Sequence, residues 1–523
     1  MMIGVTNMQS QGKLLLKKYF DENSFVEASI KSFNHFLEKG LQEIINETSE
    51  ITPPILPPNV EEFKIKLGNI SVLKPEIIEA DGSKRSIYPA EARIRQLTYA
   101  APVHLEVSSY INGVQRESFL AHVGNLPIMV KSKNCYLAGL SRSELLKLGE
   151  DPDDVGGYFI INGSEKVVVM IEDLAPNRFT VEKAKLGPSA FIGTIFSERN
   201  ALRIPHTLEK MRDGIFYLSF SRLKRIPLAL VIKALGLIKD EDVVKFVGFQ
   251  DPSEVIVNLY EFIDIKTQEA ALDAIAKRIG FTQPKEQRIK RVEEILDRFL
   301  LPHIGTNPDV RIWKAVQLCK IWKKFLMVSN GITEQDDKDH YANKRLKLAG
   351  DLLEDLFRVN LRILIGDLLY NFQRIVKRGK IPSIRVIIRE KLLTQRLHSS
   401  MATGAWVGDR KGVSQRIEHL NYLQTLSQLQ RVVSPLSSSQ ENFEARSLHP
   451  TQLGRLCPTE TPEGTNIGLR KNLALLARVT LQVDEAKILP VLEKAGLKLE
   501  SFVKFEETSQ GQEQASQLQS LNH

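Results

Sequence analysis

Cysteine is scarce in this sequence, and long apolar runs are missing. Its three cysteines, Cys135, Cys319 and Cys457, stand far apart without C-x-x-C spacing, which excludes a disulfide framework and a zinc ribbon within the chain. We expect reduced, buried thiols. No apolar stretch reaches the roughly 18 residues of a membrane helix, and residues 1–10 show no signal-peptide pattern. These absences predict a cytoplasmic chain without membrane contact.

The residues that are present favour several domains and an anionic partner. A chain of 523 residues with 42% hydrophobic and 26% charged residues is long enough for more than one core. Its net charge of +8 is concentrated: eight Lys or Arg stand against Glu390 alone between residues 371 and 396, a net +7. The overlapping window 391–478 carries eleven basic and six acidic residues. Such a concentration favours an anionic ligand in the 370–478 region.

Local patterns predict helices on both sides of a strand-rich region. Apolar residues at helical spacing run from Leu14 to about Thr48 and again through 345–378. Between them lie strand patterns, a hairpin that turns at Asn162-Gly163, and a mixed segment that predicts a separate domain. Residues 506–523 are rich in Gln, Ser and Glu, which predicts disorder. The strands, hairpin and mixed segment cover residues 67–72, 103–111, 118–122, 158–170 and 187–328.

The segment from Ala445 to Leu475 is too interrupted by proline and glycine to be a regular helix or strand. We expect a rigid, folded-back loop. Glu460 and Glu463 lie close in sequence to several cations, so we expect these acids to orient some of them and leave others for an anionic ligand. A connector with solvated charges explains the same residues. The cations are Arg446, Arg455, Arg470 and Lys471.

Sequence blocks in this segment and upstream of it resemble one protein family. Thr459-Glu-Thr-Pro-Glu-Gly464, Gly468-Leu469 and Lys471-Asn-Leu-Ala474 resemble the fork region of the second-largest subunit of cellular RNA polymerases. The chain length resembles B″, the N-terminal half of the split archaeal subunit, which is related to bacterial beta. The upstream blocks that agree in order are 91–99, 124–129 with 131–135, 156–167, and 336–340 with Lys344-Arg345.

The resemblance implies a multidomain α+β fold of mixed helices and antiparallel sheets. It divides the chain into a protrusion, an inserted lobe, and a fork with two loops. Its last part is the start of an external region followed by the disordered tail. The implied boundaries are 1–186 for the first part of the protrusion, 187–330 for the lobe, 331–392 for the second part of the protrusion, 393–480 for the fork and 481–523 for the remainder.

Two segments resemble the fork loops. Residues 403–415 resemble the first, which lies against the RNA–DNA hybrid; a solvated hairpin tip anchored by a buried Trp406 explains them as well. Residues 431–448 resemble the second, near downstream DNA, and we expect a mobile tip. The resemblance implies that Arg446 and Glu463 support the active centre, where Glu463 orients a cation. The implied nucleic-acid contacts are Arg410, Lys411, Arg431, Arg455, Arg470 and Lys471.

The implied function is template-directed RNA synthesis from nucleoside triphosphates, together with B′ and the largest-subunit chains. Nucleotidyl transfer needs clustered carboxylates that hold metal ions. The Asp-rich stretches 151–154 and 336–339 are better explained as turns or helix caps. We therefore expect no catalytic residue, metal or cofactor on this chain, which is inactive alone, and Mg²⁺ on the largest subunit. Its own part is to position the DNA template, the hybrid and the nucleotide.

Some positions depart from the family pattern, and two other functions remain possible. Gln428, Gln430 and the pair Gln452-Leu453 replace residues that are frequent in the family, so no nucleic-acid contact is assigned to them. The chain could be a free-standing paralogue that binds nucleic acid or inhibits the polymerase. It could also be an interaction scaffold without nucleic-acid contact. Co-purification with B′ and hybrid binding after Arg410→Ala plus Lys411→Ala separate these alternatives.

Overall fold

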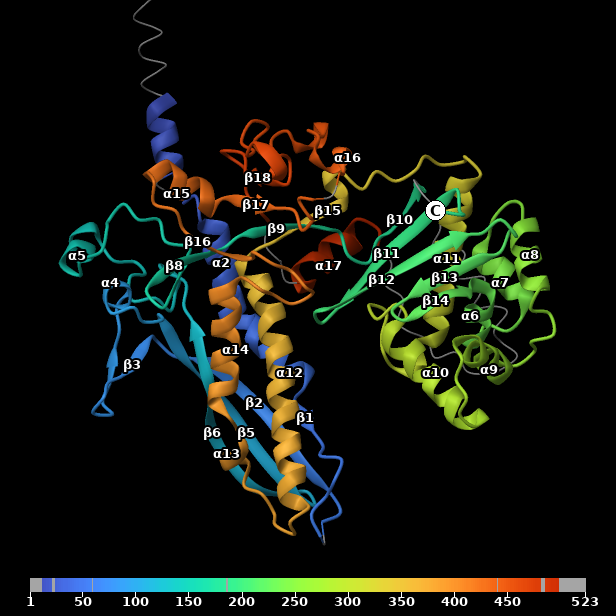
Figure 1. The fold of residues 1–523 in the computed structure, drawn as a ribbon, viewed down its shortest axis with the longest axis horizontal. Coiled ribbons are helices and arrows are strands. Elements are labelled where there is room, and N and C mark those ends of the chain that lie inside the picture. Colours follow the sequence, from blue (N-terminus) through green and yellow to red (C-terminus); the bar gives the residue numbers. More distant parts are fainter. Residues whose placement is uncertain are drawn as a thin grey trace, which may run out of the picture. The chain divides into compact units, whose positions relative to one another are not determined.

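The computed structural model describes residues 12–20, 24–58, 60–184, 187–439, 441–480 and 485–497. The chain divides into one compact unit from Met1 to Val479 and a second from Thr480 to His523. The first unit contains two hydrophobic cores, helices and several antiparallel sheets (Figure 1). This architecture confirms the expected multidomain α+β class.

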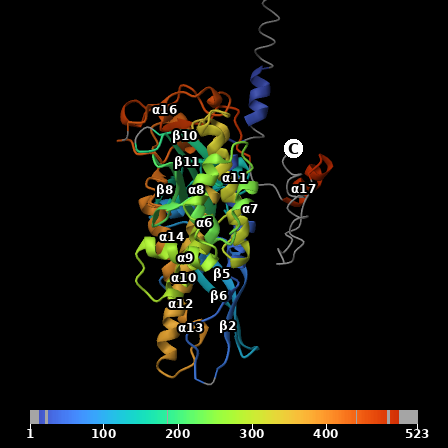
Figure 2. The same ribbon diagram turned by 90° about the vertical axis from the view of Figure 1, so that its right-hand side faces the viewer.

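The larger core lies between a four-stranded antiparallel sheet and a layer of helices, as Figures 1 and 2 show. The strand order is β1-β2-β5-β6, and Phe63 of the sheet packs on Phe372 of the longest helix with 4.8 Å between ring centroids. The predicted N-terminal helix is present but contains one π-helical turn, Phe36–Gly40. The elements are α2 (Glu27–His35), α3 (Leu41–Glu47), β1 (Glu50–Ile51), β2 (Phe63–Val72), β5 (Ala100–Ile111), β6 (Val114–Pro127), α12 (Ala349–Val376) and α14 (Glu390–Thr403).

The longest helix, α12, begins later than the sequence predicts. Residues Lys344–Lys347 form strand β15, which pairs antiparallel with Ile171–Leu174. Leu348 then leads into the helix, and its N–H donates to Asp351 Oδ2 at 2.9 Å. The apolar spacing continues back through β15, so periodicity alone could not show the strand. This short strand connects the helix layer to the fork.

The second core belongs to a five-stranded antiparallel meander, β10-β11-β12-β13-β14, covered by helices. Trp322 and Phe325 of its longest helix pack on Phe216 of the sheet, with centroids 5.5 and 5.4 Å away. The first strand begins at Phe179, ahead of the expected lobe boundary at 187, and the domain division stays a prediction. The strands are β10 (Phe179–Lys183), β11 (Phe191–Arg199), β12 (Leu202–Lys210), β13 (Phe216–Phe220) and β14 (Leu223–Pro227), and the helices are α6 (Leu228–Ala234), α7 (Asp240–Val247), α8 (Ser253–Tyr260), α9 (Gln268–Ile279), α10 (Lys285–Phe299) and α11 (Arg311–Ser329).

Two small sheets include the strands of the predicted fork, residues 393–480. The order β15-β9-β17-β18 joins three distant parts of the sequence, and β16-β8-β7 includes the predicted hairpin, in which Ile161 pairs with Ser164 around Asn162-Gly163. Both turn residues have positive φ, 49° and 73°, as a type I′ turn requires. The elements are β7 (Phe159–Ile161), β8 (Ser164–Val168), β9 (Met170–Leu174), β16 (Ser414–Arg416), α15 (Tyr422–Leu429), β17 (Arg431–Val433), α16 (Phe443–Arg446) and β18 (Arg470–Asn472).

The remaining elements are short. No helix among the described residues combines the length and apolar character needed to cross a membrane. In the second unit the structure describes α17 (Glu485–Lys494), and the predicted disordered tail, 506–523, lies outside the described residues. The other elements of the first unit are β3 (Glu76–Ile78), β4 (Lys84–Ser86), α4 (Pro89–Ile94), α5 (Arg142–Lys147) and α13 (Ile384–Ile387).

Candidate nucleic-acid interface

A cleft of about 900 Å³ lies between the two segments that the sequence predicts to be fork loops. One side is Gly408–Val413, from the loop after α14, and the other includes Val433–Ser438, from the loop after β17. Strand β9 contributes Ile171–Leu174 to the lining. The cleft is therefore bounded by both loops and by a strand of the fork sheet. Its cationic lining residues are Arg203, Lys338, Lys344, Arg410, Lys411 and Arg470.

The first loop is fixed by a buried tryptophan and an ion pair. The indole N–H of Trp406 donates to Leu352 O of α12 at 2.8 Å, which confirms that Trp406 anchors the loop. Arg410 is largely buried and donates to the carboxylate of Asp173 on β9, which Arg203 also contacts at 2.9 Å. The next residue, Lys411, is exposed. The two predicted phosphate contacts thus differ, because Arg410 is already paired.

The strand pair β17–β18 separates two adjacent cations onto opposite faces. Successive strand residues alternate between faces, and Lys471 faces inward with Val432, its partner in register. Only 6% of the Lys471 side chain is exposed; its Nζ lies 3.2 Å from Glu172 Oε2 and donates to Tyr341 Oη at 2.9 Å. Burial lowers the pKa of Lys471, although the charge of Glu172 opposes this shift. Lys471 is therefore part of the interior, whereas Arg470 lies on the other face.

Arg431 and Arg470 form a pair of like charges on that outer face. The register places Arg470 opposite Val433, so Arg431 is its diagonal neighbour on the same face. Among the described residues, neither guanidinium forms an ion pair or a hydrogen bond. Partial burial lowers the pKa of Arg431, and the charge of Arg470 lowers it further. The charges of Glu418 and Glu460 oppose this shift without a direct ion pair. Two neighbouring cations that lack a direct ion pair are suited to an anionic group such as phosphate.

Arg446 is held by the backbone of the second loop and of the segment after it. Its guanidinium donates to the carbonyl oxygens of Thr465, Ile467 and Ser438 at 2.7, 3.1 and 2.9 Å. Close packing supports this arrangement, because a Cβ added to Gly468 would lie 2.1 Å from Arg446 O. Arg446 thus closes the second loop onto the proline-rich segment, which is folded back as predicted.

Glu460 and Glu463 are exposed, and neither forms an ion pair with a described residue. The charge of Glu460 nevertheless opposes the lowering of the Arg431 pKa. The expectation that these acids orient cations stays a prediction. Arg455 is also exposed, with one hydrogen bond from its guanidinium to Thr451 O at 3.1 Å.

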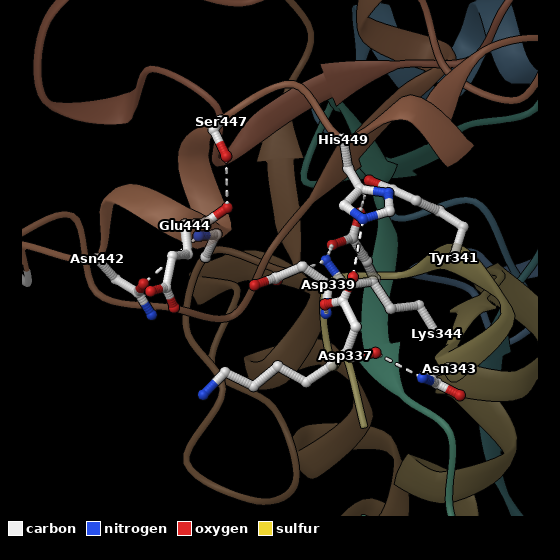
Figure 3. Close-up of polar contacts among 12 residues, drawn as sticks. Asp337, Asp339, Tyr341, Asn343, Lys344, Asn442, Glu444, Ser447 and His449 are labelled. Atoms are coloured by element: carbon white, nitrogen blue, oxygen red, sulfur yellow. Dashed lines mark hydrogen bonds and ion pairs between the residues drawn. The ribbon is translucent and has the colours of Figure 1, made fainter. Parts of the chain in front are cut away.

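A polar cluster connects the proline-rich segment to residues 337–344, as Figure 3 shows. The imidazole of His449 points toward Asp337, with 2.9 Å between Nε2 and Oδ2. Burial opposes ionisation of Asp337, but hydrogen bonds from the Asp339 N–H and from His449 hold its pKa below the usual value. Asp339 contacts Lys344 at 3.3 Å. The turn at residues 338–339 confirms the predicted turn, and the acids of this stretch also form ion pairs that the sequence did not predict.

The glutamines that depart from the family pattern are structural. Gln428 is 2% exposed; it accepts from Glu418 N at 2.9 Å and donates to Arg416 O at 2.8 Å. Gln452, 5% exposed, donates to Tyr341 Oη at 3.3 Å. Sequence reasoning did not identify Glu172 and Tyr341 as the partners of Lys471. Their burial in the folded chain is the only signal that could have indicated this role.

The described residues fit no metal centre. They contain no group of three or more His, Cys, Asp or Glu placed to hold a metal ion. The two acids of β9 that line the cleft are engaged by cations: Asp173 by Arg203 and Arg410, and Glu172 by Lys344 and Lys471. The thiols are free, and Cys457 is only half-buried, which corrects the expectation that all three are buried.

Comparison with known proteins shows the family. Residues 24–395 match the family model of the RNA polymerase beta subunit, and residues 415–479 match that of RNA polymerase Rpb2, domain 3. The chain is 44% identical over 493 residues to DNA-directed RNA polymerase subunit Rpo2N of Methanocaldococcus jannaschii, which covers 92% of this chain and 98% of that relative. It is 43% identical over 499 residues to Rpo2N of Methanococcus vannielii, covering 93% and 99%.

A longer relative shows which part of the family the chain represents. Identity to DNA-directed RNA polymerase subunit Rpo2 of Saccharolobus shibatae is 41% over 488 residues, which is 92% of this chain but 43% of that relative. The match therefore extends over most of this chain and over less than half of the undivided form. The chain belongs to the RNA polymerase beta subunit family, and over more than nine tenths of its length it is similar to archaeal subunits named Rpo2N.

Proposed function

We propose that this chain forms one wall of the polymerase active centre and holds the RNA–DNA hybrid and template by phosphate contacts. Assembled with B′ and the largest-subunit chains in the cytoplasm, it takes part in template-directed RNA synthesis. We assign the catalytic Mg²⁺ to the largest subunit, as the family resemblance implies. The contribution of this chain is positional: fixed cations keep the reacting groups in a geometry suited to attack.

The observation that carries this proposal is the pair Arg431 and Arg470. Both are fixed on a short antiparallel strand pair, and neither forms an ion pair with a described residue. Arg470 also lines the cleft between the two loops. An anion placed there would offset both the burial and the repulsion from Arg470 that lower the pKa of Arg431. Phosphate contacts of this kind are independent of base sequence, which suits an enzyme that transcribes any template.

Of the other predicted residues, some are proposed to contact phosphates and some to hold the fork in place. Lys411 and Arg455 are exposed and are proposed to contact phosphates directly. Arg410 and Lys471 are paired with Asp173 and Glu172, so we assign them to holding the loop and the strand pair in place.

Arg446 and Glu463 are proposed to support the active centre in different ways. Arg446 fixes the second loop through three carbonyl oxygens. Glu463 is exposed and unpaired among the described residues, so its carboxylate is available to orient a cation of another polymerase chain.

The test is reconstitution of the complete polymerase with Arg431→Ala plus Arg470→Ala. We expect weaker binding of an RNA–DNA hybrid scaffold and a salt dependence whose slope falls by about 0.7 to 0.9 for each phosphate that the protein no longer neutralises. A control variant, Lys147→Ala plus Lys290→Ala, removes two exposed cations outside the fork and should bind as the unmodified enzyme does. Unchanged binding by the arginine variant would favour the scaffold without nucleic-acid contact.

Two further measurements separate the proposal from a free-standing paralogue. The isolated chain should make no RNA, and it should be recovered in complex with B′ and the largest-subunit chains. Primer extension by polymerase with Arg446→Ala or Glu463→Ala should be slowed, with the larger effect on kcat because the change is in positioning. Normal elongation by both variants would refute these two assignments.

A further inference from the structure

The end of α12 farthest from the fork carries exposed cations that the proposed function does not use. Arg374 lies in the last turn of α12, Lys377 is the C-cap of this helix, and Arg378 follows in the turn after it. Lys380 lies in the connection to α13, and Arg385 lies in α13. All five are exposed. We call these five residues the distal basic surface.

The distal basic surface is attached to the end of the large sheet. Arg116 of β6 donates to Pro382 O at 3.3 Å, and Ile384 N donates to Glu117 Oε2 at 3.1 Å. The Arg385 guanidinium lies 5.6 Å from the ring centroid of Phe119. Figures 1 and 2 both show α13 beside α12 at this end of the sheet. The cations are therefore held by the fold, and Arg116 adds another beside them.

Two acids close to this surface in the sequence are already engaged. Asp367 of α12 forms an ion pair with Arg389, and Glu390 contacts His122 at 2.7 Å. Within the described ranges, no residue of the distal basic surface forms an ion pair. The helix dipole stabilises cations in the last turn of α12, which explains Arg374 but not Lys380 or Arg385, since these lie beyond the helix. A solvated surface normally mixes both signs of charge, so this cluster needs another explanation.

The distal basic surface lies too far from the cleft for a short ligand bound in the cleft to reach it. Helix α12 has 28 residues, which at 1.5 Å each extend about 42 Å. The helix begins directly after β15, a strand of the fork sheet. At 3.4 Å per base pair, this length corresponds to about 12 base pairs of duplex. A ligand that reaches both places must be an extended polyanion.

We propose that the distal basic surface contacts the phosphate backbone of duplex DNA outside the RNA–DNA hybrid. The inference rests on the proposed function, because nucleic acid held at the fork brings its duplex arms to this distance. Exposed Lys and Arg side chains without carboxylate partners suit phosphate contacts that ignore base sequence. An acidic segment of another protein is the competing ligand, and the experiment below separates the two.

The experiment uses reconstituted polymerase in which four cations are neutralised together: Arg374→Gln, Lys377→Gln, Arg378→Gln and Lys380→Gln. Three scaffolds are compared by fluorescence anisotropy: a hybrid without duplex arms, and hybrids with an upstream or a downstream arm of about 20 base pairs, which is longer than the length of α12 requires. A matched control neutralises four exposed lysines that also lack ion pairs among the described residues. These are Lys147, Lys224, Lys285 and Lys290.

We expect the variant to lose roughly tenfold or more in affinity for at least one scaffold with an arm, and its salt slope to fall by about three. Binding of the scaffold without arms, and all binding by the control, should stay unchanged. The proposal would be overturned if the variant bound each of the three scaffolds as tightly as the unmodified enzyme does. It would also be overturned if the variant lost as much affinity for the scaffold without arms as for the scaffolds with an arm. Loss of poly-glutamate binding with unchanged DNA binding would assign the surface to an acidic protein instead.

The same scaffolds keep this proposal separate from the proposed function. Arg431→Ala plus Arg470→Ala should weaken the scaffold without arms, which the distal variant leaves unchanged. If Arg431→Ala plus Arg470→Ala does not weaken binding of the scaffold without arms, the proposed function fails, whatever the affinities for the scaffolds with an arm. If only the distal variant has no effect, the inference about the distal basic surface fails alone. Equal thermal melting of the distal variant and the unmodified chain shows that its fold is intact.

Discussion

Lys471 of β18 and Glu172 of β9 form a buried ion pair that joins the fork to the core, with 3.2 Å between Nζ and Oε2. The two side chains are 6% and 5% exposed. Burial opposes ionisation of Glu172, but the charges of Lys471 and Lys344 outweigh it and hold its pKa below the usual value. Because Lys344 also contacts Glu172, at 2.9 Å, removing Lys471 leaves this carboxylate with one cation, whereas removing Glu172 leaves Lys471 without a carboxylate partner.

Replacing Lys471 by Ala should destabilise the sheet that contains β9 and β18. Breaking a buried pair by removing one partner typically costs about 3 to 5 kcal/mol, and we expect a smaller loss here because Lys344 still contacts Glu172. The chain has several cores, so global unfolding is not two-state, and local hydrogen exchange is the better measurement. We expect faster exchange of the amides of β9 and β18 in Lys471→Ala.

The neighbouring arginine provides the control for this prediction. Arg470 makes no ion pair with a described residue, so Arg470→Ala should leave exchange in β9 within about 0.5 kcal/mol of the unmodified chain. Similar exchange in both variants would show that the Lys471–Glu172 pair does not hold the strands together.

This strand pair also shows why the sequence located the interface but not the role of each residue. Arg470 and Lys471 are adjacent cations in one motif, and the sequence assigned both to nucleic acid. Strand alternation sends them to opposite faces, but the strand has only three residues, too few for a visible pattern. The partner of Lys471 is 299 residues away in the sequence. No local signal could indicate it.

The elements that could be predicted have strong local signals. The spacing of apolar residues predicts α12, and Asn162-Gly163 predicts the β7–β8 hairpin, because both depend on neighbours in the sequence. Arg446 illustrates the opposite case. Its partners are backbone carbonyls of Thr465, Ile467 and Ser438, and every residue has a carbonyl group, so residue types cannot reveal such contacts.

Substitution of Gly468 by Ala should displace the second loop. Gly468 has φ of +71°, where a Cβ costs roughly 1 to 2 kcal/mol, and the Cβ would also lie 2.1 Å from Arg446 O. Backbone atoms cannot rotate away as a side chain can, so the hydrogen bonds of Arg446 should be lost. Limited proteolysis should therefore cleave the 434–446 region faster.

Gly464 is the matched control for that substitution. Its φ is +81°, but nothing lies within 4 Å of an added Cβ. Gly464→Ala should thus incur the conformational cost alone and keep the second loop protected. If both variants are cleaved at the same rate, close packing against Arg446 is not what orders the loop.

Arg410 and Lys411 should respond differently to alanine, although they are adjacent. Arg410→Ala removes a partner of Asp173, so we expect faster hydrogen exchange in the first loop. Lys411 is exposed and unpaired among the described residues, so Lys411→Ala should leave exchange unchanged. In reconstituted polymerase it should instead reduce the salt slope of hybrid binding by about 0.7 to 0.9. Identical profiles for the two variants would contradict this division of roles.

Cys457 should be the first of the three thiols to be alkylated. The Thr459 hydroxyl lies 3.3 Å from its Sγ, and hydrogen bonds from this hydroxyl and from backbone N–H groups lower the pKa of Cys457. Burial instead raises the pKa of Cys135, and that of Cys319 to about 12. Because the thiolate is the reactive form, a lowered pKa shifts half-maximal labelling of Cys457 to a lower pH than that of an unperturbed cysteine.

Iodoacetamide labelling of the folded chain followed by peptide mass spectrometry measures this order across a pH series. Thr459→Val removes the hydroxyl at similar size, and it should move the labelling midpoint of Cys457 to higher pH while leaving Cys135 and Cys319 unlabelled. Labelling of Cys319 before Cys457 would contradict the burial pattern, and an unchanged midpoint in Thr459→Val would contradict the role of the hydroxyl. Because Cys457 lies between Arg455 and Thr459 on the proline-rich segment, slower labelling of the reconstituted polymerase after a hybrid scaffold is added would report directly on occupation of the fork.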